Sequence, residues 1–433
     1  MTVNDVTPTY DVSALRARFP SLRAGYAHFD GPGGSQVPDA VAEAVAATML
    51  APLAHRGAVT EAERTADAVV LGARAAMADL LAADPRGTVF GRSATALTFD
   101  LARTLAAGWG PGDEVVVTRL DHDANIRPWV LAAEAVGATV RWLDFDPSTG
   151  ELDDVAPLLS ERTRLVAVTG ASNLIGTRPP VRSIADAAHA AGALVHVDGV
   201  HLTAHTAVDV AALGADVFVC SPYKFLGPHC GVLVADPALL ETLHPAKLAP
   251  SSDAVPERFE LGTLPYELLA GTTAAVDVLA GIVDGPGVDG SGVDGPGDRR
   301  ARLVRSMGAV EAHEDRLRRR VEDGLAALPG VTVWSRAAHR TPTLLLTIEG
   351  RDPADAYRFL AERGVNAPAS SFYALEASRR LGLGDAGALR VGLAPYSDDT
   401  DVDRLLAGLA DFTAAWRSSG TSSGGTSRNS GGR

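Results

Sequence analysis

Short apolar runs alternate with Ala-rich stretches from about residue 29 to residue 279. The runs read GTVF (87–90), DEVVVT (113–118), ATVRWLDF (138–145), TRLVAVTG (163–170), ALVHVD (193–198) and DVFVCS (216–221). Runs of this length that are apolar nearly throughout are typical of strands buried on both faces. Between them, WVLAAEAVG (129–137) and RSIADAAHAAG (182–192) have helical periodicity and end in a glycine that suits a C-cap. The alternation predicts a mostly parallel sheet covered by helices, with ligands bound beyond the carboxyl ends of its strands.

The pattern changes after residue 282. VDGPG, VDGSG and VDGPG follow one another, and such a repeat has no side chains to bury. A charged helix is then expected at about 299–328, followed by the strand TPTLLLTIEG, a helix at 353–363 and the closing helix DVDRLLAGLADFTAAW. We therefore predict an N-terminal segment that packs with the small domain (1–28), a large domain (29–282), a flexible loop (283–298), a small α+β domain (299–418) and a disordered tail (419–433).

Composition and charge limit the kinds of partner that we expect the protein to bind. The formal net charge of -14 argues against nucleic acid, which needs a basic surface. Cys220 and Cys230 are too few for a disulfide framework and lack metal-ligand spacing. The start of the chain shows neither a basic region nor an apolar run, and no window is expected to be apolar over the length of a membrane span. The prediction is a cytoplasmic protein with no nucleic-acid or membrane partner.

The most informative segments are VHVDGVHLTAH (195–205) and SPYKFLGPHCGVL (221–233). Asp198 ends one apolar run, and Lys224 follows the next run 26 residues later. A carboxylate at a strand end can hold a cationic heterocycle, and a lysine there can act as a nucleophile and proton shuttle. Alone, each residue is more simply a turn aspartate or a solvated lysine. Together, at neighbouring strand ends, they indicate an active site.

These segments resemble the class V aminotransferase family, fold type I enzymes that use pyridoxal 5'-phosphate (PLP) and include the cysteine desulfurases. Within it the chain is most similar to desulfurase-like proteins with a DHDAN motif, and the likeness covers about 28–280 and 300–410. The resemblance implies an α/β architecture, the PLP-dependent transferase fold type I. Its large domain holds a mostly parallel seven-stranded sheet, and a smaller α+β domain lies C-terminal to it. It also implies PLP bound to Lys224 as a Schiff base, with Asp198 against the ring nitrogen.

Other motifs extend the resemblance residue by residue. TRLDHDANIRPW (118–129) places His122 where the family stacks a histidine on the ring, so the implied catalytic set is Lys224, His122 and Asp198. FGRSATALTF (90–99) resembles a phosphate-binding turn that opens a helix. The implied cofactor contacts are Ala94, Thr95, His122, Asn173, Asp198, His201, Ser221, Lys224 and Thr263, and the implied substrate contacts are Arg56, Asn173 and Arg390.

The implied position of Thr263, in the loop RFELGT (258–263), also concerns oligomeric state. The family's equivalent loop reaches the phosphate of a neighbouring subunit. The resemblance therefore implies a homodimer with shared active sites.

The chain departs from the desulfurase pattern where those enzymes carry a nucleophilic cysteine. The corresponding region, GVNAPASSFYALEASRRLG (364–382), contains none, and Tyr223 stands where desulfurases often have histidine. We therefore expect a PLP-dependent C–S lyase or β-eliminase that acts on an amino acid without a persulfide relay. An aminotransferase or epimerase is the alternative. Two remoter hypotheses are a metal-dependent hydrolase built on His196, Asp198, His201 and His205, and a PLP-binding protein without catalysis.

Overall fold

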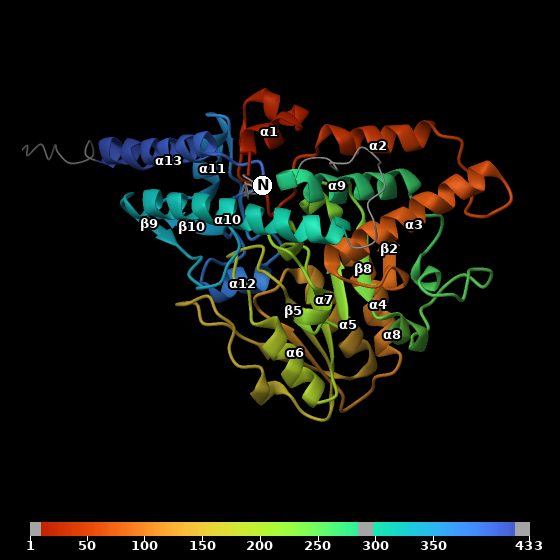
Figure 1. Ribbon diagram of the computed structural model, residues 1–433. Helices are drawn as coiled ribbons and strands as arrows, with labels where there is room; N and C mark the ends of the chain where they lie inside the picture. The colour runs from red at the N-terminus through yellow and green to blue at the C-terminus, as the bar shows by residue number, and fades with distance from the viewer. Residues whose placement is uncertain (1–9, 285–297, 421–433) are drawn as a thin grey trace, which may run out of the picture.

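A computed structural model describes residues 10–284 and 298–420 of the chain (Figure 1). Residues 285–297 of the predicted loop and 421–433 of the predicted tail lie outside the described residues. The large domain is built on a seven-stranded sheet in the order β2-β8-β7-β6-β5-β3-β4. Its strands are β2 (Thr88–Gly91), β3 (Glu114–Thr118), β4 (Thr139–Leu143), β5 (Thr163–Thr169), β6 (Leu194–Asp198), β7 (Val217–Cys220) and β8 (Gly231–Ala235). Each of the six apolar runs contains one strand, and β8 alone runs opposite to the other six strands of this sheet, so the predicted mostly parallel sheet is confirmed.

Both faces of this sheet are buried. In β3, Val115 and Val117 belong to one hydrophobic cluster and Val116 to another on the opposite face, as the alternation of side chains along a strand requires. Helices α4 (Ala94–Ala106) and α5 (Arg127–Val136) cover the first face. Helices α3 (Glu61–Leu81), α6 (Val181–Ala190) and α9 (Tyr266–Asp284) contribute to the other. This double cover explains why the strands read as continuous apolar runs.

Helix α9 corrects one expectation. Its window Tyr266–Val283 has a mean hydropathy of 1.4 and is long and apolar enough, by composition, to cross a membrane. Half of that window is buried, because α9 packs against α2 (Asp39–Leu50), α3 and α10 (Asp298–Ala326). A buried core helix passes the same test of length and hydropathy.

The small domain pairs its own sheet with helices (Figure 1). Four antiparallel strands follow the order β12-β13-β10-β9, with bounds Ala369–Ser370, Ala388–Gly392, Thr343–Ile348 and Val331–Val333. The remaining helices of this part are α11 (Pro353–Ala361), α12 (Leu375–Arg380) and α13 (Asp399–Gly420). The order of elements is the α+β arrangement expected from the sequence.

The N-terminal part of the chain joins the small domain. After α1 (Val12–Ala17), strand β1 (Ala27–His28) pairs in parallel with β11 (Val365–Asn366), and Asp30 forms a bridge with Gly392 of β13. Short helices complete the described chain: α7 (Val210–Leu213), α8 (Pro237–Thr242), and 3-10 turns at Pro20–Ala24, Pro85–Gly87, Asp123–Asn125, Ala156–Leu158, Leu202–Ala204, Pro222–Lys224 and Glu257–Phe259. The domain boundaries given above stay predictions, but the chain clearly enters the large domain from the small one.

Candidate active site

The carboxyl ends of β5, β6 and β7 open into a cavity of about 570 Å³. The sheet contributes Thr169, Asp198 and Ser221 to its wall, each at or just after the end of a strand. The small domain contributes Phe372, Tyr373 and Arg390 from the opposite side. The cavity therefore lies between the two domains, at the carboxyl ends of the strands, where the sequence pattern predicted a ligand site.

Asp198 and Lys224 line this cavity together. Asp198 ends β6, and burial raises the pKa of its carboxyl to about 6, although Val200 N donates to Oδ1 at 2.9 Å and Lys224 favours the anion. Burial, together with the charge of Arg390, lowers the pKa of the Lys224 amine to about 7, and its Nζ donates to Pro32 O. A lysine with a pKa near 7 is about half neutral at pH 7, and its neutral form is a competent nucleophile and base.

His122 is held by the rest of the DHDAN motif. Its Nδ1 accepts from Ala124 N at 3.0 Å, and burial with the charges of Lys224 and Arg390 lowers its pKa to about 4, so the ring is neutral. The neighbouring Asp121 is fully buried, and burial raises its pKa to about 8. Its carboxyl group bonds the Thr118 hydroxyl and accepts from Asn125 Nδ2 at 2.6 Å. This buried group of hydrogen bonds fixes the backbone that carries His122.

The N-terminus of α4 supplies an anion-binding end to the cavity. Ser93 caps the helix by accepting from Ala96 N at 3.1 Å, and Ala94 and Thr95 line the wall beside it. Gly231 lets the start of β8 lie close to the start of α4, because a Cβ at residue 231 would lie 2.5 Å from Ala94 N. Free amide groups and the helix dipole at this position favour a phosphate.

Among the side chains on the wall, Asn173 and His201 each have a buried polar atom with no hydrogen-bond partner among the described residues. These atoms are Oδ1 of Asn173 and Nδ1 of His201. Asn173 is oriented by its Nδ2, which donates to Phe372 O at 2.9 Å, and His201 by contacts of its Nε2 with two threonine hydroxyls, Thr341 and Thr343, at 2.9 Å each. Both atoms fit a polar ring substituent of a ligand, since buried polar groups are normally satisfied.

Arg390 lies on β13, with its side chain at the small-domain side of the cavity. Nη2 donates to Asp30 Oδ1 at 2.6 Å and Nη1 donates to Asn173 O at 3.0 Å, while Nε has no partner in the described part of the chain. The ring of Phe372 covers one face of the guanidinium at 3.6 Å. The guanidinium is thus fixed in orientation, and the second N–H of Nη1 and of Nη2 is left to bind a carboxylate.

These features together fit PLP. The carboxylate of Asp198 suits a protonated ring nitrogen, the start of α4 suits the phosphate, and Lys224 lies where a covalent bond to the aldehyde is needed. A protonated ring nitrogen would also lower the raised pKa of Asp198 by supplying the missing cation.

Two expected contacts lie elsewhere in the chain. Arg56 does not line the cavity, because it forms ion pairs with Asp67 at 2.8 Å and Glu257 at 2.9 Å. Thr263 is exposed and also lies outside the cavity wall. Neither residue therefore belongs to the site formed by its own chain. The assignment of Thr263 to the phosphate of a neighbouring subunit and that of Arg56 to the substrate remain predictions.

The described residues do not provide the ligands that a metal-dependent hydrolase would need. His196 packs its ring edge-on against Trp129, and His205 Nδ1 bonds Glu314 at 2.8 Å. Among residues 10–284 and 298–420, no three histidine, cysteine or acidic side chains converge as a metal site would require.

Several wall residues were not expected from the sequence. Asp30, Arg127, Phe372 and Tyr373 all line the cavity. Asp30 belongs to the glycine-rich segment FDGPGG (29–34), and Arg127 lies two residues after the DHDAN motif. The absence of cysteine from 364–382 did mark that region as unusual, but gave no indication that aromatic rings would lie over Arg390 and His122.

Comparison with known proteins agrees with this site. The family model described as aminotransferase class-V matches residues 27–283 and 301–405. The uncharacterized protein MT3887 of Mycobacterium tuberculosis is 35% identical over 93% of this chain and 99% of its own length. A cysteine desulfurase of Dickeya dadantii is 32% identical, covering 92% of this chain and 96% of its own. The crystal structure of the cysteine desulfurase CsdA from Escherichia coli superposes with a TM-score of 0.80 at 28% identity, covering 94% of this chain and 99% of that one.

Proposed function

The chain belongs to the aminotransferase class-V family and is a PLP-dependent enzyme, and on that premise we propose that it is a C–S lyase that eliminates a thiol from an S-substituted cysteine. The observation that carries the proposal is the composition of the cavity wall. The region 364–382, which brings residues 370, 372 and 373 to that wall, contains no cysteine, whereas the groups for binding an amino acid and moving its α-proton are all present.

The two cysteines of the chain do not replace the missing one. Neither Cys220 nor Cys230 lines the cavity, and both are buried. Burial raises the pKa of the Cys220 thiol well above its usual range and that of Cys230 to about 11. Neither thiol is therefore a thiolate near neutral pH, which argues against sulfur transfer to the protein.

The side chains divide the work of the reaction. When bound, PLP supplies an electron sink for the electrons left on the substrate α-carbon. Asp198 keeps the ring nitrogen protonated, and the start of α4 with Ser221 holds the phosphate. Arg390 binds the substrate carboxylate, and the Lys224 amine takes the α-proton and returns a proton to the product. The Phe372 ring excludes water from the guanidinium face and so strengthens carboxylate binding.

We also propose a homodimer in which Thr263 completes the partner's phosphate site. The exposed position of Thr263, outside its own cavity, supports this arrangement. Large exposed apolar side chains at Met49, Leu50 and Leu261 are consistent with a further protein surface covering them. Light scattering of the purified holoenzyme measures the mass directly.

The reaction is tested by incubating the PLP-loaded enzyme with S-methyl-L-cysteine. Elimination and hydrolysis consume one water and release one methanethiol, one pyruvate and one ammonia. Equal amounts of the three products support the lyase. A keto acid that retains the methylthio group, with conversion of the cofactor to its amine form, would replace the lyase by an aminotransferase. Appearance of the D-isomer alone would replace it by an epimerase.

A further inference from the structure

The segment 370–374, here called the aromatic segment, covers the small-domain side of the cavity. It places Phe372 over Arg390 and the ring of Tyr373 against His122, with ring centroids 5.5 Å apart. Its backbone is tied to the large domain at two carbonyls. Asn173 Nδ2 donates to Phe372 O at 2.9 Å, and Asp123 N donates to Tyr373 O at 2.7 Å.

This conformation is not the one that the segment prefers. Phe372 and Tyr373 have φ values of 51° and 58°, in the left-handed region that bulky side chains rarely adopt. Two such residues in succession persist only where surrounding contacts hold them. Tyr373 is 76% exposed, so burial of its own ring provides little of that support.

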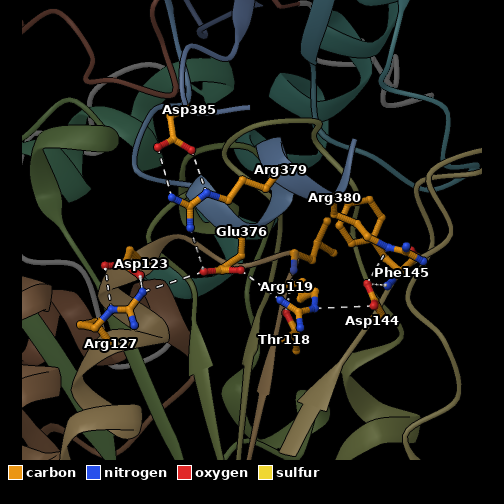
Figure 2. A network of polar contacts seen from close by, with 11 residues as sticks. Thr118, Arg119, Asp123, Arg127, Asp144, Phe145, Glu376, Arg379, Arg380 and Asp385 are labelled. Atoms are coloured by element: carbon orange, nitrogen blue, oxygen red, sulfur yellow. Dashed lines mark hydrogen bonds and ion pairs between the residues drawn. The ribbon is translucent and has the colours of Figure 1, made fainter. Parts of the chain in front are cut away.

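The support comes from the helix that follows. In α12, Glu376 is only 15% exposed and faces three arginines of the polar network in Figure 2. Its carboxylate lies 3.0 Å from Arg119 Nη1, 4.0 Å from Arg127 Nη2 and 3.8 Å from Arg379 Nη1. Arg119 and Arg127 belong to the large domain and flank the DHDAN motif.

The network is continuous with the cavity wall. Arg127 lines the cavity and also bonds Asp123 at 3.1 Å, and Asp123 is the residue whose backbone N–H holds Tyr373. At the C-terminal end of α12, Arg380 pairs with Asp144 at 2.7 Å. Glu376 is therefore the acidic residue of α12 that pairs with large-domain arginines beside the cavity.

We propose that Glu376 is a positioning residue: its ion pairs with Arg119 and Arg127 hold the aromatic segment over the cavity and so set the enzyme's affinity for its amino acid substrate. Glu376 itself touches no reacting atom, since it does not line the cavity. The effect on substrate affinity rests on the proposed function, but the effect on the segment does not.

The segment can be tested without any substrate, because chymotrypsin cleaves after Phe372 and Tyr373. Holoenzyme of Glu376→Gln, which keeps the shape but loses the charge, is expected to be cut there about fivefold faster than the unaltered protein. Glu376→Asp restores the charge and should recover most of the protection. Asp385→Asn is the matched control. It removes the exposed ion pair, 2.7 Å long, between Asp385 and Arg379 of α12, and this pair does not reach the large domain. Cleavage sites are identified by mass spectrometry, and the protease rate is normalised with a small peptide.

Salt provides a second measurement of the same ion pairs. Raising the ionic strength should speed cleavage of the unaltered protein and should change that of Glu376→Gln less. Equal protection of the unaltered protein and Glu376→Gln, at low and high salt, would overturn the proposal.

The affinity arm uses S-methyl-L-cysteine. Glu376→Gln is expected to raise KM about fivefold with kcat nearly unchanged, and Asp385→Asn to change neither. A fall in kcat at constant KM would contradict a positioning role. If S-methyl-L-cysteine is not a substrate at all, the proposed function fails while the protease result still decides what holds the segment.

Discussion

The two sides of the cavity are built in different ways. The floor, made of Asp198, His201, Ser221 and Lys224, comes from the ends of adjacent strands and the turns after them, and Asp198, His201 and Ser221 are each less than 10% exposed. The aromatic segment opposite comes from a short stretch between β12 and α12, with two left-handed residues and one largely exposed ring. Sheet topology fixes the floor, whereas individual side-chain contacts fix the segment.

Because of this difference, we expect the two sides of the cavity to affect different kinetic constants. In the proposed reaction, groups on the floor act on the cofactor and the α-proton, so changes there should appear in the chemical step. In the same proposal, groups on the small-domain side hold the substrate carboxylate or exclude water, so changes there should appear mainly in KM. Variants on the two sides of the cavity therefore test whether kcat and KM depend on different residues.

The largest effect is expected on the floor. Lys224→Ala should lower kcat for S-methyl-L-cysteine by about 10³-fold or more, because it removes the amine that is proposed to move the α-proton. The variant should still bind PLP through Asp198 and the start of α4, as measured by equilibrium dialysis. Turnover at the rate of the unaltered enzyme would show that the floor does not carry the chemistry.

The next effect is expected at the small-domain side. Arg390→Lys keeps the charge but loses the planar arrangement of N–H groups, so KM should rise about 10- to 100-fold with a smaller change in kcat. Steady-state kinetics over a wide range of S-methyl-L-cysteine concentration gives both constants. A fall confined to kcat would place Arg390 with the floor instead.

A third prediction concerns pH. Because burial and the charge of Arg390 lower the pKa of Lys224 to about 7, the neutral amine should increase about tenfold between pH 6 and pH 8 and then level off. The rate at which apoenzyme takes up PLP covalently, followed by absorbance, should follow the same curve. The matched control is the reaction of PLP with a free lysine derivative, whose rate keeps rising toward pH 10. A rate for the protein that also rises to pH 10 contradicts the lowered pKa.

The smallest effect is expected in the aromatic segment. Phe372→Leu keeps an apolar side chain but removes the ring from Arg390, so KM should rise about threefold while kcat stays the same. Because Phe372 has a positive φ, the thermal unfolding of the variant should be compared with that of the unaltered protein. A large loss of kcat would mean that the segment takes part in the chemical step.

The floor could be predicted from the sequence because its residues are tied to strands. Asp198 and Lys224 follow two apolar runs that lie side by side in the sheet, so their proximity follows from the order of strands. The DHDAN motif gave the position of His122. No pattern in the sequence indicated that Asp121 and Asn125 would turn inward to support His122.

The small-domain side could not be predicted in the same way. The ion pair of Asp30 with Arg390 joins residues 360 positions apart, and their meeting depends on how the two domains pack. The left-handed backbone at Phe372 and Tyr373 opposes the local preference of both residues, so tertiary contacts override it. The apolar helix α9 illustrates the same limit, since neighbouring helices rather than composition decide what covers it.

The pairing of β1 with β11 has a consequence for synthesis of the chain on the ribosome. Ala27 leaves the ribosome early, but its partner Val365 emerges only when most of the polypeptide has been translated. The stretch just after β1, including Asp30 and Pro32, lines the cavity and cannot be anchored in place before then. The large sheet can assemble while translation continues, whereas a nascent protein gains a complete catalytic pocket only near the end of its production.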